Sequence, residues 1–279
     1  MMAFEYFHPE HPNTPQIWVM DLAQGFKSAR PLVDDDSYNS WPSWSPDSQW
    51  ISFMSGKETI KGYILKNKIS VLTEQIYKVN VHDGTIVQLT HFSKETALGD
   101  STSWSVDGRI AFEYDDDIYS VSASGGNENK LIDLKAVLAS GSLWGIDWSP
   151  DGSRLTFRGS PRGSSSGQQR IWVVDALGRH IVPVTTGPTD ENPSWLDNEH
   201  ILFERWSKRG EVRVCVVCLP ASKVTCLTRG HVDIGPRADA SGHTIFFARG
   251  DIPKNGTNTL FPNTHIYALT LAGGTLESK

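Results

Sequence analysis

Three cysteines are the residues of this chain most readily associated with metal or redox chemistry: Cys215, Cys218 and Cys226. The spacing of Cys215 and Cys218 is that of half a zinc site. However, both lie in the β-branched run 212–218, and residues three apart on a strand face opposite sides of the sheet. The sequence therefore predicts no metal site here. Cys218 and Cys226 could pair across a hairpin, but we favour the interpretation that the cysteines are buried free thiols.

A nucleophile is the next chemical possibility, because residues 163–167 read Gly-Ser-Ser-Ser-Gly and match the Gly-x-Ser-x-Gly of a hydrolase elbow. An elbow needs a strand before it and a helix after it. This segment is instead a Ser- and Gly-rich link between two predicted strands of one unit. The 9 histidines are scattered along the chain, and no two have ligand spacing on one element. The sequence thus predicts no catalytic centre, no metal and no cofactor in this chain alone.

Charged side chains in and before a recurring tryptophan motif are the remaining candidates for binding. Carboxylates gathered at one rim of a domain would attract a cation or the basic end of a peptide. The competing interpretation is that Asp is a good loop residue because it bonds to local backbone. The candidate rim residues are Asp100, Asp147, Asp190, Glu191, His231, Asp233 and Arg237.

The tryptophan motif reads Trp-Ser-Pro-Asp-Gly in its fullest form, and it returns at intervals of about 43 residues with one longer insertion. Pro, Asp and Gly in this order favour a tight turn. The tryptophan strand before the turn and the apolar strand after it therefore form a hairpin. We expect the tryptophans to pack between neighbouring units. The repeat residues are Trp44, Trp104, Trp148 and Trp195, with Asp47, Asp107 and Asp151 in the turns and Ala238 in place of a fifth tryptophan.

A second motif follows each hairpin and consists of an Ile-aromatic strand, a turn and a short apolar strand that often ends in Leu-Thr. Ile76-Tyr77 with Leu89-Thr90 is a clear copy. Each unit is therefore a four-stranded antiparallel meander. Such units, repeated at this length, predict an all-β propeller. The best helical pattern, 133–140, is short and links two units.

Together the Trp-Ser-Pro-Asp-Gly turns and the Ile-Tyr-x-Val strands resemble the TolB-like propeller repeat. This repeat also occurs in the propellers of prolyl oligopeptidase-like and dipeptidyl peptidase-like serine peptidases and in the tricorn protease. The resemblance covers nearly the whole chain and implies a six-bladed β-propeller of four-stranded antiparallel blades. It is specific for the fold and poor for function, because such folds host many roles.

Two functions follow from the resemblance. TolB docks other proteins, so we expect a non-catalytic scaffold that binds a protein or peptide partner at the channel mouth and rim loops. The first alternative is the substrate-gating propeller of a prolyl oligopeptidase-like serine peptidase whose catalytic domain lies outside this chain. The second alternative is an enzyme with a metal or acid–base site in the channel.

The repeats predict a single propeller domain over residues 1–279. Residues 3–6 repeat the second strand of a blade, 111–114, so the first blade is expected to be three-stranded with this edge facing the channel. The last blade is expected to lack its outermost strand. We therefore expect an imperfectly closed ring or a piece of a longer protein. The predicted blades span approximately 1–36, 37–92, 93–134, 135–187, 188–230 and 231–279.

Overall composition excludes several classes of protein. With 38% hydrophobic and 21% charged residues, the chain has the composition of a globular protein with a core. A net charge of -6 gives no general attraction to nucleic acid or anionic lipid. No stretch approaches the roughly 20 apolar residues that span a bilayer, and residues 1–10 lack a signal-peptide pattern. We expect a soluble protein, cytoplasmic unless an export signal has been trimmed from its N-terminus.

Overall fold

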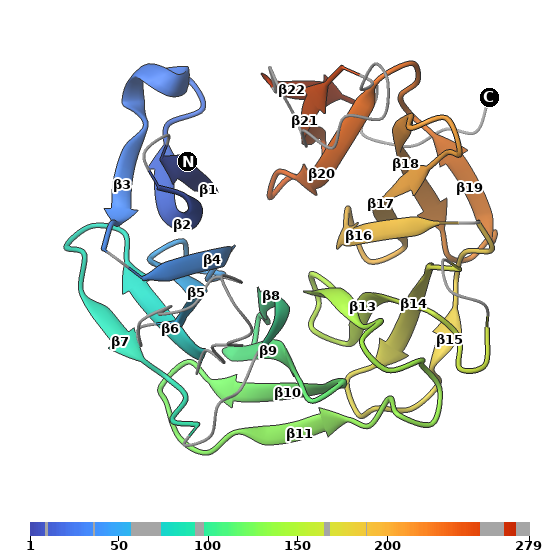
Figure 1. Ribbon diagram of the computed structural model, residues 1–279, viewed down its shortest axis with the longest axis horizontal. Coiled ribbons are helices and arrows are strands. Elements are labelled where there is room, and N and C mark those ends of the chain that lie inside the picture. Colours follow the sequence, from blue (N-terminus) through green and yellow to red (C-terminus); the bar gives the residue numbers. More distant parts are fainter. Residues whose placement is uncertain are drawn as a thin grey trace, which may run out of the picture. The chain divides into compact units, whose positions relative to one another are not determined.

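The computed structural model describes residues 1–8, 11–35, 37–56, 74–92, 98–164, 168–187, 189–251 and 265–271, and the regular secondary structure of these residues is almost entirely β (Figure 1). They form two compact units, Met1–Asp133 and Leu134–Lys279, which we treat separately. Within the described ranges, helical structure is confined to the 3-10 helix η1 (Gly25–Ser28). The stretch 133–140 forms a turn and a single β-bridge instead of a helix. No helix in the described part has the length and apolar character needed to cross a membrane.

The part of unit 1 that the structure describes forms three antiparallel sheets, in each of which the strands pair in chain order. The first has three described strands, and the other two have four. The strands of unit 1 are β1 (Met2–His8), β2 (His11–Met20), β3 (Arg30–Val33), β4 (Tyr38–Trp44), β5 (Trp50–Gly56), β6 (Gln75–Asn80), β7 (Ile86–Gln88), β8 (Leu98–Trp104), β9 (Arg109–Tyr114), β10 (Asp117–Ser122) and β11 (Asn129–Ile132).

The described residues of unit 2 form one four-stranded sheet and one seven-stranded sheet. The larger sheet consists of two antiparallel meanders, β16–β19 and β20–β22, joined where Val212 pairs in parallel with Val232. The strands of unit 2 are β12 (Trp144–Trp148), β13 (Arg154–Gly159), β14 (Arg170–Asp175), β15 (Val182–Pro183), β16 (Asp190–Trp195), β17 (His200–Trp206), β18 (Val212–Cys218), β19 (Lys223–Cys226), β20 (Val232–Ala238), β21 (Thr244–Gly250) and β22 (His265–Thr270).

A Ser-x-Asp turn precedes β5, β9 and β13, and this turn is held by its own side chains. The hydroxyl of Ser45 donates to Asp47 Oδ1 at 2.5 Å and accepts the backbone N–H of Trp50 at 2.9 Å. Ser149 and Asp151 repeat this contact at 2.6 Å. The serine hydroxyl is the main cause of the lowered pKa of both aspartates. The motif is therefore a self-contained turn.

The threonine that closes the second motif caps the third strand of its sheet. The hydroxyl of Thr90 accepts the N–H of Ile76 at 2.8 Å, and that of Thr228 accepts the N–H of Val214 at 3.0 Å. Thr185 does the same for Ile171 at 3.0 Å. A buried backbone donor without a partner would be costly, which explains why threonine recurs here.

The core lies on the second and third strands of the sheets. One phenylalanine on each of four second strands is fully buried: Phe53, Phe112, Phe157 and Phe203. Isoleucines on the third strands, such as Ile17, Ile76 and Ile118, are equally buried. Side chains alternate between the faces of a strand, so the residue after each phenylalanine points to the opposite face. A charged residue stands at that position in several sheets, and some of these residues belong to the candidate site.

Candidate functional site

The first strand of several sheets is interrupted by a bulge. Each bulge contains one residue with positive φ: Trp41 in β4, Gly145 in β12, Asn192 in β16 and Gly235 in β20. At each of them the register with the second strand shifts. Proline follows three of the four. We call these residues the first-strand bulges. A bulge leaves backbone groups outside the ladder, so it needs partners from elsewhere.

Carboxylates on second strands supply some of those partners. Glu5 of β1 accepts the N–H of Trp41 at 2.8 Å. Glu204 of β17 accepts both the N–H of Gly235 and the side-chain amide of Asn192 through Oε1, each at 2.7 Å. Its Oε2 accepts Trp206 Nε1 at 3.2 Å. Each carboxylate thus ties its own meander to the first-strand bulge of the next meander.

Glu204 is fully buried, and the pKa of its carboxyl is raised. Burial is the largest cause, and the hydrogen bonds from Gly235, Asn192 and Trp206 oppose it only in part. The charge of Glu191 on the neighbouring strand adds to the rise. A buried carboxylate with a raised pKa is a marker of functional sites, although structural networks show the same shift.

Arg158 directly follows the core phenylalanine of β13, as Glu204 does in β17. The side chain of Arg158 is also buried. Its guanidinium lies over the ring of Trp144, 4.4 Å from the centroid, and its Nη1 lies 3.4 Å from Glu191 Oε2. Trp144 is 39% exposed, which is unusual for so large an apolar side chain. Trp144, Arg158 and Glu191 come from β12, β13 and β16 and form what we call the Trp144 site. It presents an aromatic surface beside a paired positive and negative charge.

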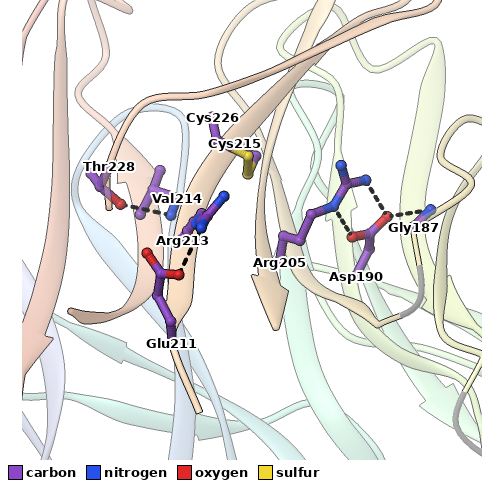
Figure 2. Close-up of a disulfide and its surroundings, with 9 residues drawn as sticks. All are labelled: Gly187, Asp190, Arg205, Glu211, Arg213, Val214, Cys215, Cys226 and Thr228. Carbon is purple, nitrogen blue, oxygen red and sulfur yellow. Dashed lines mark hydrogen bonds and ion pairs between the residues drawn. A yellow bond between two sulfur atoms is a disulfide. The ribbon is translucent and has the colours of Figure 1, made fainter. Parts of the chain in front are cut away.

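The predicted rim residues Asp190 and Asp233 are fully buried and hold arginines of the adjacent strand. Asp190 accepts two bonds from Arg205, at 2.7 and 2.9 Å, and one from the N–H of Gly187 (Figure 2). Asp233 accepts two bonds from Arg249, at 2.6 and 2.8 Å, which raises the pKa of Arg249. Any contact that these aspartates make with a partner would therefore act through their arginines.

The other rim candidates lie in different settings. Asp147 is half-buried, and its carboxylate accepts the N–H of Trp195 at 2.9 Å. His231 is half-buried, and its carbonyl accepts the N–H of Val212. Arg237 is exposed. The side chain of Asp100 lies outside the described residues. Glu191 is the one rim candidate found in the Trp144 site, and binding by the whole set stays a prediction.

The repeat tryptophans differ in burial. Trp148 and Trp195 are buried, whereas Trp44 and Trp104 are half-buried and pack against the cores of unit 1. Asp47, Asp107 and Asp151 lie in the turns, and a bond from Arg109 is the main cause of the lowered pKa of Asp107.

The cysteines correct an expectation from the sequence, because Cys215 and Cys226 form a disulfide (Figure 2). Cys215 of β18 lies directly opposite Cys226 of β19, whereas Cys218 lies opposite Lys223. The prediction of three free thiols is therefore wrong, and so is the alternative pair of Cys218 with Cys226. Cys218 is the free thiol. The register of β19 decides the pairing, and the sequence does not fix that register.

Other chemical candidates contribute little to a site. In the part of the chain that the structure describes, no group of three His, Cys, Asp or Glu side chains could hold a metal ion. The centre of the Gly-x-Ser-x-Gly segment, 165–167, lies outside the described residues. A hollow of about 500 Å³ lies between β14–β15 and β18–β19. Its one charged lining residue, Arg154, lies over the ring of Trp195, and its other polar lining side chains are the hydroxyls of Thr185, Thr186 and Ser222.

Sequence reasoning missed Trp144, Arg158 and Glu204. A signal for two of them was present, since a charged residue directly follows the core phenylalanine in Phe112-Glu113, Phe157-Arg158 and Phe203-Glu204. A charge at a strand position next to the core residue indicates a buried partner. Trp144 gave no comparable signal, because it stands outside the repeated motif.

No family model matches the chain. Among curated proteins, it is 26% identical over 155 residues to an uncharacterized protein of Agrobacterium fabrum, Atu1656, over 50% of this chain and 46% of that protein. The chain therefore spans just under half the length of this relative.

Solved structures show the fold. TolB from Acinetobacter baumannii superposes with a TM-score of 0.71 at 18% identity, over 98% of this chain and 61% of that chain. A putative TolB from Agrobacterium tumefaciens gives 0.70 at 16% identity, over 99% and 88%. Pyrococcus horikoshii acylaminoacyl peptidase gives 0.57 at 16% identity, over 96% and 41%. The predicted resemblance is confirmed at the level of fold: the chain is an all-β protein whose four-stranded antiparallel sheets match TolB-like propeller structures.

Proposed function

We propose that this chain is a non-catalytic scaffold that binds a peptide or protein segment at the channel mouth, with the Trp144 site as a principal contact. The supporting observation is the half-exposed Trp144 ring beside the ion pair of Arg158 with Glu191. Aromatic and arginine side chains are enriched where binding energy concentrates. Inner strands border the channel of a propeller, and all three residues lie on first or second strands.

The ligand that suits this site is the basic end of a peptide. An ammonium group placed on the open part of the Trp144 ring would gain about 0.5–1 kcal/mol, as exposed cation–π contacts do. Glu191, whose side chain is 24% exposed, would add a carboxylate. The net charge of -6 favours approach of a basic segment over an acidic one.

The test measures binding of labelled hexapeptides by fluorescence anisotropy, comparing a lysine-rich peptide with a glutamate-rich peptide of equal length. We expect the lysine-rich peptide to bind at least about tenfold more tightly and to weaken as salt is added. Trp144→Ala and Glu191→Gln should each raise the Kd about fivefold, the equivalent of about 1 kcal/mol.

Matched controls are Leu177→Ala, an apolar side chain that is 71% exposed, and Glu199→Gln, an exposed acid. Both should bind like the wild type. Two results would refute the assignment of the site. One is an equal Kd for the lysine-rich and the glutamate-rich peptide, and the other is a Kd that neither Trp144→Ala nor Glu191→Gln changes.

A second candidate function is the substrate-gating propeller of a serine peptidase. It is favoured by the match to Pyrococcus horikoshii acylaminoacyl peptidase, of which this chain covers 41%. The gene sequence that adjoins this reading frame tests it. A strand, a Gly-x-Ser-x-Gly turn and a helix encoded there would support the peptidase. Without them, and with no hydrolysis of acylated aminoacyl anilides by the full natural protein, this candidate fails.

A further inference from the structure

Glu191 of the Trp144 site has a second carboxyl group as its direct neighbour. On the ladder between β16 and β17, Glu191 lies opposite Glu204. Side chains that are directly opposite on antiparallel strands share one face of the sheet, with Cβ atoms about 4.5–5.5 Å apart, and like charges there are unfavourable. We call Glu191 and Glu204 the carboxylate pair.

The two members of the carboxylate pair have different surroundings. Glu204 is fully buried, and its hydrogen bonds come from three uncharged donors, which are Asn192, Gly235 and Trp206. The side chain of Glu191 is instead 24% exposed and pairs with Arg158. Because burial disfavours the charged form of a carboxyl group, Glu204 is the member of the pair that takes up a proton.

The other charged groups on the strands around Glu204 either lie on the opposite face of the sheet or are engaged elsewhere. Side chains alternate between faces, so the register places three of them on the opposite face: Asp190, Arg205 and Arg213. Those engaged elsewhere are Arg158 with Glu191, His200 with Asp197, Arg249 with Asp233, and the exposed Arg237 with the carbonyl of Pro236. Among the described residues, no cation therefore pairs with Glu204.

We propose that Glu204 couples ligand binding at the Trp144 site to proton release: a cationic group that binds beside Glu191 displaces the proton of Glu204, so that the site selects cations and binds them more tightly as pH rises. This inference rests on the proposed function, because it needs a basic ligand in the Trp144 site. The displaced proton passes to the buffer. Glu204 does not touch the ligand and acts through Glu191.

The balance of forces on Glu204 makes it responsive to one added charge. Burial is the largest cause of its raised pKa, the three hydrogen-bond donors oppose that rise, and the charge of Glu191 adds to it. An ammonium group beside Glu191 would offset the negative charge that Glu204 faces, and a nearby opposite charge favours the ionised form of a carboxyl group.

The direction of the pH effect follows from linkage. If the bound cation lowers the proton affinity of Glu204, loss of that proton must raise the affinity for the cation by the same factor. Affinity is therefore lowest where Glu204 is protonated in the free chain and rises as pH passes through its folded pKa. That pKa is raised, so the change occurs above the ordinary range of a glutamic acid, which is about 4.3.

The experiment measures the Kd of a labelled lysine-rich hexapeptide, blocked at both ends, with the full chain from about pH 5.5 to 9, where the lysine ammonium stays charged. The Kd of the wild type should fall by about fivefold across this range, as expected for one nearby charge. The same peptide with acetylated lysines has no ammonium groups and should bind weakly at every pH.

Glu204→Gln should bind the lysine-rich peptide with a Kd that does not change with pH. Any contribution from the histidines would remain in this variant, which therefore isolates Glu204. Glu199→Gln changes an exposed acid and should keep the full pH dependence.

Two measurements on the wild type need no variant. Calorimetric titration in two buffers of different ionisation enthalpy should show release of a fraction of a proton for each peptide bound. Infrared difference spectra should show loss of a protonated carboxyl band on binding of the lysine-rich peptide, and no such loss with the acetylated peptide.

The outcomes separate this inference from the proposed function. A Kd that is constant with pH but still raised by Trp144→Ala would overturn the inference and leave the proposed function standing. Absence of binding at every pH would overturn both. Binding of the lysine-rich peptide without proton release, or an unchanged pH dependence in Glu204→Gln, would also overturn the inference.

Discussion

Reduction of the disulfide between Cys215 and Cys226 should destabilise unit 2 by an amount that can be calculated from the chain. The two cysteines are separated by 11 residues. Closing a loop of this length removes about 9 cal/mol/K of entropy from the unfolded chain, or about 3 kcal/mol at 25 °C. For a domain of this size, that corresponds to a fall in Tm of about 6–12 °C.

The assay compares urea unfolding of the oxidised wild type with and without a phosphine reductant that does not absorb in the far ultraviolet. The free energy of unfolding should fall by about 3 kcal/mol on reduction. Cys218→Ala removes the free thiol and should keep the full effect of the reductant. Cys226→Ala removes the bridge and should abolish that effect.

Two results would refute this reasoning. Three titratable thiols in the oxidised, denatured protein would show that the bridge does not form. An intact bridge, mapped by mass spectrometry to Cys215 and Cys226, together with an unchanged free energy of unfolding on reduction would show that the chain-entropy argument fails for this hairpin.

Three further predictions concern buried groups. The folded pKa of Glu204 is raised, so its contribution to stability is complete below the unfolded pKa of about 4.3 and is lost as pH rises through the folded value. Glu204→Gln should therefore flatten the fall in the free energy of unfolding with pH, measured by urea unfolding between pH 4 and 9. An unchanged dependence on pH would contradict this prediction. Asp190→Asn breaks the pair with Arg205 and should cost about 3 kcal/mol, against less than about 0.5 kcal/mol for Glu199→Gln, which changes an exposed acid; equal losses in chemical denaturation would count against the pair. Phe112→Ala should cost about 3–5 kcal/mol and Phe4→Ala clearly less, as measured by the same method, because Phe4 is only half-buried; the reverse order would contradict this difference in burial.

Much of the fold could be predicted because its determinants are local. The Ser-x-Asp turn is held by bonds between residues two and five apart, such as Ser45 with Asp47 and Trp50. Strand alternation and turn chemistry were therefore sufficient to predict antiparallel meanders. The helical pattern of 133–140 misled because a short stretch follows its tertiary surroundings rather than its propensity.

The candidate site was less predictable because its contacts join residues that are far apart in the chain. Asp190 and Asp233 were expected among the rim residues, and the structure adds that both carboxylates are buried and paired with arginines one strand away. Nothing in the local sequence distinguishes a rim carboxylate from one that is paired inside. Trp144 became a candidate only when its exposure and its contact with Arg158 were known.

The bond from Gly235 to Glu204 has a consequence for how unit 2 comes apart. If β20 separated from β18, the N–H of Gly235 would move away from Glu204, and the buried carboxylate would lose this hydrogen-bond donor. Local opening of one meander therefore raises the free energy of the meander beside it, in the manner of nearest-neighbour coupling in repeat proteins. β17 and β20 should behave as a single cooperative folding unit, and their slowest amides should exchange through one shared opening event.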